Sequence, residues 1–132
     1  MATLDLDLLE RARAAVNADP AFRRLGTADM AVGLRRGDAS FLVRFEAFEC
    51  AAVEAADDDR MRDADFELAL PAGAWDRYLA ERRAGKAPTL LSLDLDTPGG
   101  LVRGRDPLRA LEFERYQATL QAFIDKSAEL AA

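Results

Sequence analysis

The spacing of apolar residues along this chain changes from helical to strand-like and back, and this change restricts the folds available to it. From residue 30 to residue 70, apolar residues tend to recur at every second position, as in a strand with one buried face. In the run Ala64–Leu70, for example, Phe66, Leu68 and Leu70 share one face and acidic residues occupy most of the other. Before and after this region the spacing is three or four residues, which is typical of amphipathic helices. The pattern therefore predicts an α+β fold.

Five strands are expected, four of them before residue 71. These four are Met30–Leu34, Phe41–Phe48, Glu49–Ala56 and Ala64–Leu70, and a short fifth strand is expected at Leu101–Gly104. The sequence Arg-Gly-Asp at 36–38 suits a tight turn between antiparallel strands. The acidic stretch at 57–60 is expected to form a polar turn. Because one face of each strand is apolar, we expect a mostly antiparallel five-stranded sheet with helices packed on one face.

Helices are expected at 5–17, 20–25 and 72–84, and a short one at 88–95, where the alternating leucines would also suit a strand. The last helix should run from Asp106, a good N-cap followed by Pro107, to about Leu130. Its apolar stripe consists of Leu111, Phe113, Tyr116, Leu120, Phe123, Ile124 and Ser127. No repeat or linker interrupts the pattern, so residues 1–132 are predicted to form one domain.

Two segments carry a resemblance to a known family. The strand Ala64–Leu70 runs directly into a helix, and the sequence GLVRGRDPL at 100–108 combines a short strand with the start of the long last helix. In this, the chain resembles sterol carrier protein 2-like (SCP2) domains, in particular their bacterial branch. The hairpin at Arg36-Gly37 and the strand Phe41–Phe45 also fall where that family has them, and the resemblance covers roughly residues 25–124. Family members usually have Gly-Asp before the last helix, whereas Arg105 intervenes here and lengthens the loop by one residue.

The resemblance implies a sheet-and-helix sandwich that encloses an apolar cavity for a lipid, a sterol or a fatty acyl chain. The residues expected to line this cavity are Phe41, Val43, Phe45, Phe66, Leu68, Trp75, Tyr78, Leu91, Tyr116, Leu120 and Phe123. The same side chains would equally suit a solid core, since protein interiors pack as densely as organic crystals. Trp75 and Tyr78 each have a polar tip that needs a partner when buried, either a ligand headgroup or a backbone carbonyl.

The residue types present argue against catalysis by the chain's own side chains. There is no histidine and only one cysteine, so the commonest general base and the usual zinc ligands are missing. A small isomerase-like enzyme would need an acidic residue in an apolar pocket. Enzymes of that class usually end in long curved strands, whereas this chain is predicted to end in a helix, so that class is the least favoured. We therefore expect no enzyme activity and no cofactor.

Charge and hydropathy restrict the partners. The net charge is −6 and no basic stripe is present, which argues against nucleic acid. No apolar run approaches the ~18 residues of a membrane-spanning helix. The acidic start of the chain is unlike a signal peptide, and lone Cys50 suits a reducing compartment, so we expect a cytoplasmic protein.

Four polar clusters need separate interpretation. The acidic residues at 57–59 resemble a calcium site in composition only, and Asp94 and Asp96 are expected to cap and shape a loop. Arg82, Arg83 and Lys86 form one basic cluster, and Arg103 with Arg105 another. Either basic cluster would suit a carboxylate or a phosphate, although both more simply balance an acidic surface.

Two functions thus remain in competition. The first is non-catalytic binding or carriage of an apolar molecule or acyl chain. The second is an accessory module, monomeric or homodimeric, with a filled core, which would bind a protein partner through an exposed apolar patch such as Leu42 and Phe48.

Overall fold

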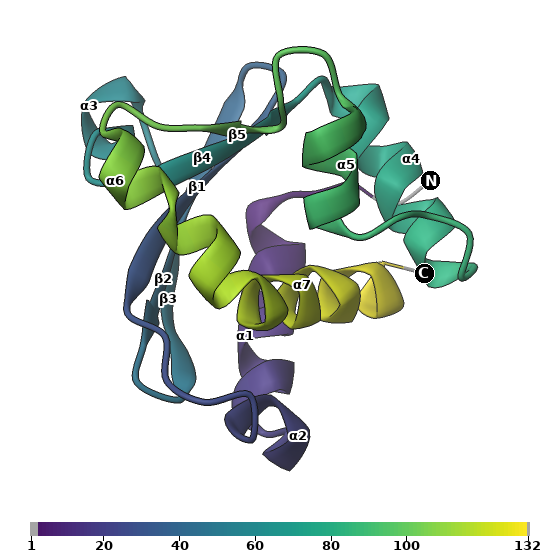
Figure 1. Ribbon diagram of the computed structural model, residues 1–132. Helices are drawn as coiled ribbons and strands as arrows, with labels where there is room; N and C mark the ends of the chain where they lie inside the picture. Colours follow the sequence, from purple (N-terminus) through teal and green to yellow (C-terminus); the bar gives the residue numbers. More distant parts are fainter. Residues whose placement is uncertain (1–2, 132) are drawn as a thin grey trace.

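A computed structural model describes residues 3–131, which form seven helices and a five-stranded sheet. Figure 1 shows the sheet from its edge, with most of the helices on one side. The elements are α1 Leu6–Asn17, α2 Pro20–Arg23, β1 Met30–Arg36, β2 Ala39–Glu46, β3 Glu49–Ala55, α3 Asp58–Met61, β4 Phe66–Leu70, α4 Ala72–Arg83, α5 Leu90–Asp96, β5 Val102–Arg103, α6 Pro107–Ala110 and α7 Glu112–Leu130.

The sheet is mixed, with strand order β3-β2-β1-β4-β5. Three of its four strand pairs are antiparallel, but β1 and β4 are parallel, with Val32 opposite Phe66 and Leu34 opposite Leu68. The α+β class and the five strands predicted from the sequence are confirmed. The parallel pair arises because the chain crosses over the sheet after β3 and enters β4 beside β1 in the same direction.

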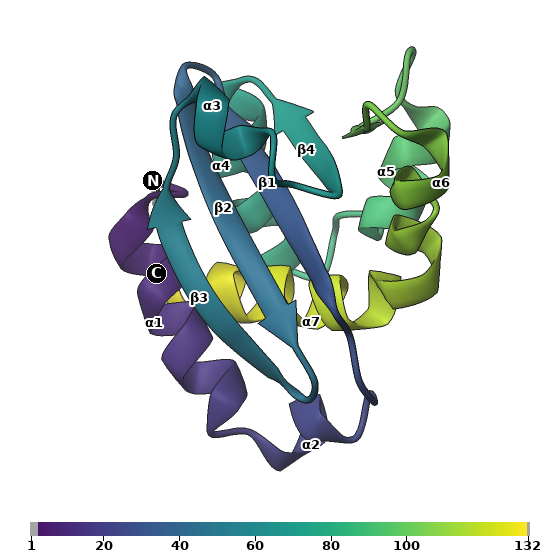
Figure 2. The same cartoon turned by 90° about the vertical axis from the view of Figure 1, so that its left-hand side faces the viewer.

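The crossover contains α3, which corrects the prediction of a simple polar turn at 57–60. Asp57 caps this one-turn helix by accepting a hydrogen bond from the backbone N–H of Arg60 at 2.8 Å. Figure 2 shows α3 in front of the sheet and α1, α4 and α7 behind it. The predicted helical layer therefore covers one face, whereas α3 covers part of the opposite face, which we call the outer face.

Close packing of α3 on the outer face explains a glycine in the middle of β1. A Cβ on Gly33 would lie 2.6 Å from Cε of Met61, so the absence of a side chain lets Met61 pack against the strand. Met61 and Leu42 are buried on this face. The apolar patch predicted from Leu42 and Phe48 is consequently wrong for Leu42, and exposed Phe48 lies beneath the guanidinium of Arg23.

The last helix is also divided where a single helix was predicted. Asp106 does cap α6, accepting a hydrogen bond from the backbone N–H of Leu108 at 2.9 Å. The chain then turns at Leu111. The prediction that Leu111 belongs to the buried apolar stripe is wrong, because its side chain is 56% exposed. A second kink at Tyr116 directs the rest of α7 across the inner face of the sheet. No helix within residues 3–131 combines the length and the apolarity needed to cross a bilayer.

Candidate functional site

The side chains predicted to line a cavity lie in the layer between the sheet and the helices. Phe41, Val43, Phe45, Phe66, Leu68, Trp75, Tyr78, Leu120 and Phe123 are buried, and Leu91 and Tyr116 are half-buried. Many of them contact one another or a neighbouring aromatic ring. Phe45 meets Phe123 edge-on with ring centroids 5.5 Å apart, and Phe66 meets Phe113 in the same way at 5.7 Å. A ligand in the centre of this layer would have to displace such contacts.

The polar tips of Trp75 and Tyr78 are hydrogen-bonded to the backbone. The indole Nε1 of Trp75 donates to the carbonyl oxygen of Arg35 at 2.6 Å, and the Tyr78 hydroxyl donates to that of Pro88 at 2.9 Å. Burial raises the pKa of Tyr78, which keeps its hydroxyl protonated as a donor. The Trp75 bond joins α4 to β1, the Tyr78 bond joins α4 to the segment before α5, and the two rings meet edge-on at 6.3 Å.

Tyr78 also borders a hollow between α4 and α5, which we call the α4–α5 slot. Its volume is about 230 Å³. It is lined by Leu70, Ala74, Arg77, Tyr78, Glu81, Pro88 and Leu93. Apart from Tyr78, none of these residues was predicted to line the site. The helical spacing of Ala74, Tyr78 and Glu81 was the signal that could have identified the wall on α4.

The second wall of the slot is the short helix α5, whose ends are held by hydrogen bonds and whose Leu90 is buried in the core. Thr89 caps it, and the backbone N–H of Leu90 donates to Oε1 of Gln121 on α7 at 2.7 Å. At its other end, Oδ1 of Asp94 accepts hydrogen bonds from the backbone N–H groups of Leu101 and Val102 at 2.7 and 2.8 Å. Asp94 thus has the loop-shaping role predicted for it.

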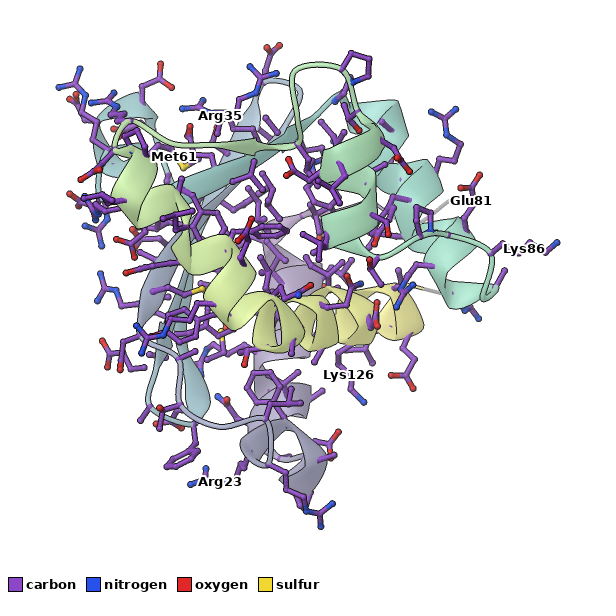
Figure 3. All side chains as sticks on the ribbon, viewed as in Figure 1. Arg23, Arg35, Met61, Glu81, Lys86 and Lys126 are labelled. Carbon is purple, nitrogen blue, oxygen red and sulfur yellow. The ribbon has the colours of Figure 1, made fainter. Side chains whose placement is uncertain are left out.

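The basic cluster at the end of α4 does not form one site. Arg82 is held by both carboxylate oxygens of Asp125 at 2.7 and 3.1 Å, an ion pair that joins α4 to α7. Lys86 points away from the molecule (Figure 3), whereas Glu81 lines the α4–α5 slot. Within residues 3–131, no three acidic, cysteine or histidine side chains gather closely enough to hold a metal ion.

The pKa of one carboxylate is raised, which is the direction that an acid catalyst requires. Burial and the nearby Asp65 raise the pKa of Glu112, and its Oε2 is buried without a hydrogen-bond partner among residues 3–131. Asp65 itself is bound by the backbone N–H of Ala31 at 2.8 Å and by Arg109. This pair lies at the junction of β4, α6 and α7 and does not line the α4–α5 slot.

The single thiol is protected from chemistry. Cys50 is fully buried, and burial raises its pKa to about 12. Its backbone is fixed by Asn17, whose side chain exchanges two hydrogen bonds with it at 2.8 and 2.9 Å.

Because the thiolate is the reactive form, we expect Cys50 to react with a maleimide at pH 8 only at the rate of global unfolding. Rapid modification of the folded protein would contradict this expectation. Mass spectrometry measures the maleimide adduct with and without urea, and rapid modification should require urea.

Comparison with protein-family models, with curated proteins and with solved structures found no match to this chain.

Proposed function

We propose that this protein binds an apolar, chain-like molecule such as a fatty acyl chain, without transforming it, and that the ligand enters at the α4–α5 slot. The observation that carries the proposal is the slot itself. Four of its seven lining residues, Leu70, Ala74, Pro88 and Leu93, are apolar, and a fifth, Tyr78, contacts the buried ring of Trp75.

The rim of the slot suits a chain with one polar end. Arg77 is exposed and takes part in no ion pair within residues 3–131. Its guanidinium can form two parallel hydrogen bonds to a carboxylate. Binding of the ligand's acyl chain would be favoured by its removal from water, worth about 0.8 kcal/mol for each buried CH₂ group.

The slot has to widen to hold a whole ligand, since sites for small molecules usually measure about 300–1,000 Å³. We propose that α5 moves outward for this purpose. It has only seven residues, its ends are held by hydrogen bonds to Gln121 and through Asp94, and its one fully buried side chain is that of Leu90. The resemblance to SCP2 domains, in which an apolar cavity lies between sheet and helices, is consistent with such a site.

Filling the slot tests the proposal. Ala74 is half-buried on the slot side of α4, whereas Ala80 is exposed and does not line the slot. We expect the parent protein to bind cis-parinaric acid at one site, measured by its fluorescence. Ala74→Trp should weaken binding at least tenfold, because the loss of two buried CH₂ groups is worth about 1.6 kcal/mol. Ala80→Trp, the matched control, should bind within about twofold of the parent.

A second candidate function is a protein-interaction module with a filled core. Exposed leucines on and next to α6 favour it: Leu108 is 76% exposed and Leu111 56%. Native mass spectrometry of the purified protein separates the candidates. A stoichiometric apolar passenger supports the carrier. A bare protein that binds neither acyl chains nor sterols contradicts the carrier and leaves the module.

A further inference from the structure

A second hollow lies on the outer face of the sheet, and its chemistry differs from that of the slot. It has a volume of about 200 Å³ and lies between α3 and the loop from β5 to α6. We call it the arginine pocket. It is lined by Met61, Arg62, Ala64, Phe66, Glu67, Arg103, Gly104 and Arg105.

The side chains that line the arginine pocket carry a net positive charge. Three are arginines and one is a carboxylate, which gives +3 − 1 = +2 in a protein whose overall charge is −6. The carboxylate of Glu67 is already bound by Nε of Arg35 at 2.8 Å. The pocket therefore presents more positive charge than its own carboxylate can neutralise.

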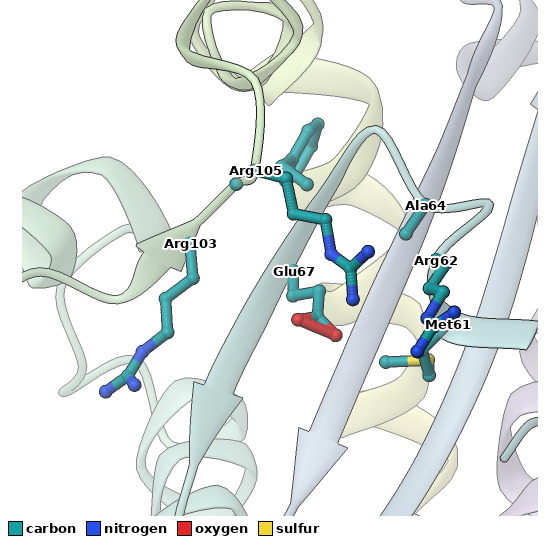
Figure 4. Close-up of a pocket in the computed structure, with 8 residues that line it drawn as sticks. Met61, Arg62, Ala64, Glu67, Arg103 and Arg105 are labelled. Atoms are coloured by element: carbon teal, nitrogen blue, oxygen red, sulfur yellow. The ribbon is translucent and has the colours of Figure 1, made fainter. Parts of the chain in front are cut away.

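Two of the arginines come from opposite walls of the pocket, Arg62 directly after α3 and Arg105 from the loop before α6. Figure 4 shows Arg105 extending over the sheet toward Arg62, with Glu67 beside it, whereas Arg103 extends away from both. Arg105 takes part in no ion pair within residues 3–131. Arg62 has only a distant one, 3.7 Å from Asp59, between two exposed side chains. Both guanidinium groups are thus available to an added anion.

The walls that carry these arginines are held in place by close packing. On the α3 side, Met61 is buried against Gly33. On the other side, a Cβ on Gly104 would lie 2.9 Å from Cβ of Ala110, so the loop passes α6 without room for a side chain. Arg105 follows directly and is the residue by which this loop departs from the SCP2 pattern.

We infer that the arginine pocket binds a phosphate monoester. A dianion matches the two cations, Arg62 and Arg105, that remain at the pocket once Glu67 is paired with Arg35. A tetrahedral phosphoryl group can also accept paired hydrogen bonds from two guanidinium groups on opposite sides, whereas a carboxylate offers two oxygens in one plane. A volume of about 200 Å³ suits a phosphoryl group and the first atoms of its ester. The pocket lies on the face of the sheet opposite the helices, so it is separate from the α4–α5 slot.

Titration of the ¹⁵N-labelled protein with phenyl phosphate, followed by amide chemical shifts at low ionic strength, tests the inference. We expect saturable shifts at residues 61–67 and 103–105. Arg105→Ala and Arg62→Ala should each weaken binding about tenfold or more, because a charge-assisted pair of hydrogen bonds is lost. Arg105→Lys keeps the charge but not the paired geometry and should recover only part of the affinity.

Two controls separate contact from general electrostatics. Arg103→Ala removes the same charge at a position two residues before Arg105. Because the Arg103 side chain extends away from the pocket centre, this substitution should weaken binding less than about threefold. Arg24→Ala removes an exposed arginine directly after α2, a helix that lies far from α3 and α6 (Figure 1), and should have no effect. Equal losses in Arg103→Ala and Arg105→Ala, or the absence of saturable shifts, would overturn the inference.

The ester can come from a soluble metabolite or from a lipid headgroup, and dihexanoyl phosphatidic acid distinguishes these sources. Tighter binding of the lipid than of phenyl phosphate, still dependent on Arg105, identifies a headgroup. Equal binding identifies a soluble ester. The carrier proposal is tested by Ala74→Trp on the other face, so either idea can fail without the other.

Discussion

Replacing Phe123 with alanine is expected to lower the free energy of unfolding by about 3–5 kcal/mol. Phe123 is fully buried in the middle of α7, and its ring meets Phe45 of β2 edge-on. Truncation removes the transfer free energy of the ring and leaves a cavity between helix and sheet that rigid neighbours cannot fill. Urea denaturation followed by circular dichroism measures the loss directly, and Tm should fall by roughly 10–20 °C.

Leu111→Ala is the matched control for that experiment. Leu111 directly precedes α7 but is 56% exposed, so its truncation should change the free energy of unfolding by less than about 0.5 kcal/mol. Phe123→Leu keeps most of the volume and should lose less than half as much as Phe123→Ala. A loss below about 1 kcal/mol in Phe123→Ala would mean that the layer between sheet and helices is loosely filled.

Replacing Asp76 with asparagine is expected to cost about 2 kcal/mol at neutral pH. Asp76 on α4 accepts two hydrogen bonds from the guanidinium of Arg36 at the end of β1, at 3.2 and 2.9 Å. Both side chains are mostly buried, with 15% and 20% exposed. The substitution leaves the Arg36 charge without its counterion, and the effect is measured by urea denaturation at pH 7.

The cost should depend on pH in one direction. The hydrogen bonds from Arg36 lower the pKa of Asp76 below its usual 3.8, so the folded state favours the ionised form. A lowered pKa stabilises the fold above the unfolded pKa and loses that effect as the pH falls through the folded value. The difference between the parent and Asp76→Asn should thus be constant near neutrality and shrink below pH 3.8. A difference that stays the same at pH 2.5 would contradict this origin.

Asp7→Asn provides the comparison for Asp76. Asp7 is paired with Arg11 on α1, but its side chain is 82% exposed. Solvent screens such a pair, so its removal should leave the stability unchanged at both pH values.

The strands and most helices were predictable because their apolar residues follow the period of the element. Phe66, Leu68 and Leu70 defined β4 by alternation, and Asp106 with Pro107 marked the start of α6. The parallel pairing of β1 with β4 was not predictable, because alternation shows which face is buried and not which strands are neighbours. The break at Leu111 was missed because its apolar side chain continues the helical spacing of the residues after it.

The burial of the candidate lining residues was also predictable, but their surroundings were not. Periodicity placed Trp75 and Tyr78 inside, yet their hydrogen-bond acceptors are backbone oxygens of Arg35 and Pro88, which no pattern of side chains reveals. The arginine pocket depends on two segments about 40 residues apart in the chain, those of Arg62 and Arg105, which line the same hollow. Charge counting found Arg103 and Arg105 together, whereas only the fold distinguishes the directions of their side chains.

The division of the sheet by its parallel pair has a consequence for folding. Strands β1 to β3 are joined by short turns and can pair early, whereas Val32 meets Phe66 only after a segment of 34 residues has closed on itself (66 − 32). Helix α7 packs on both sides of this division, through Phe123 on Phe45 of β2 and through Phe113 on Phe66 of β4. Both of these aromatic contacts are lost without that helix. The late-synthesised end of the domain therefore couples the two halves, so that they gain and lose structure together.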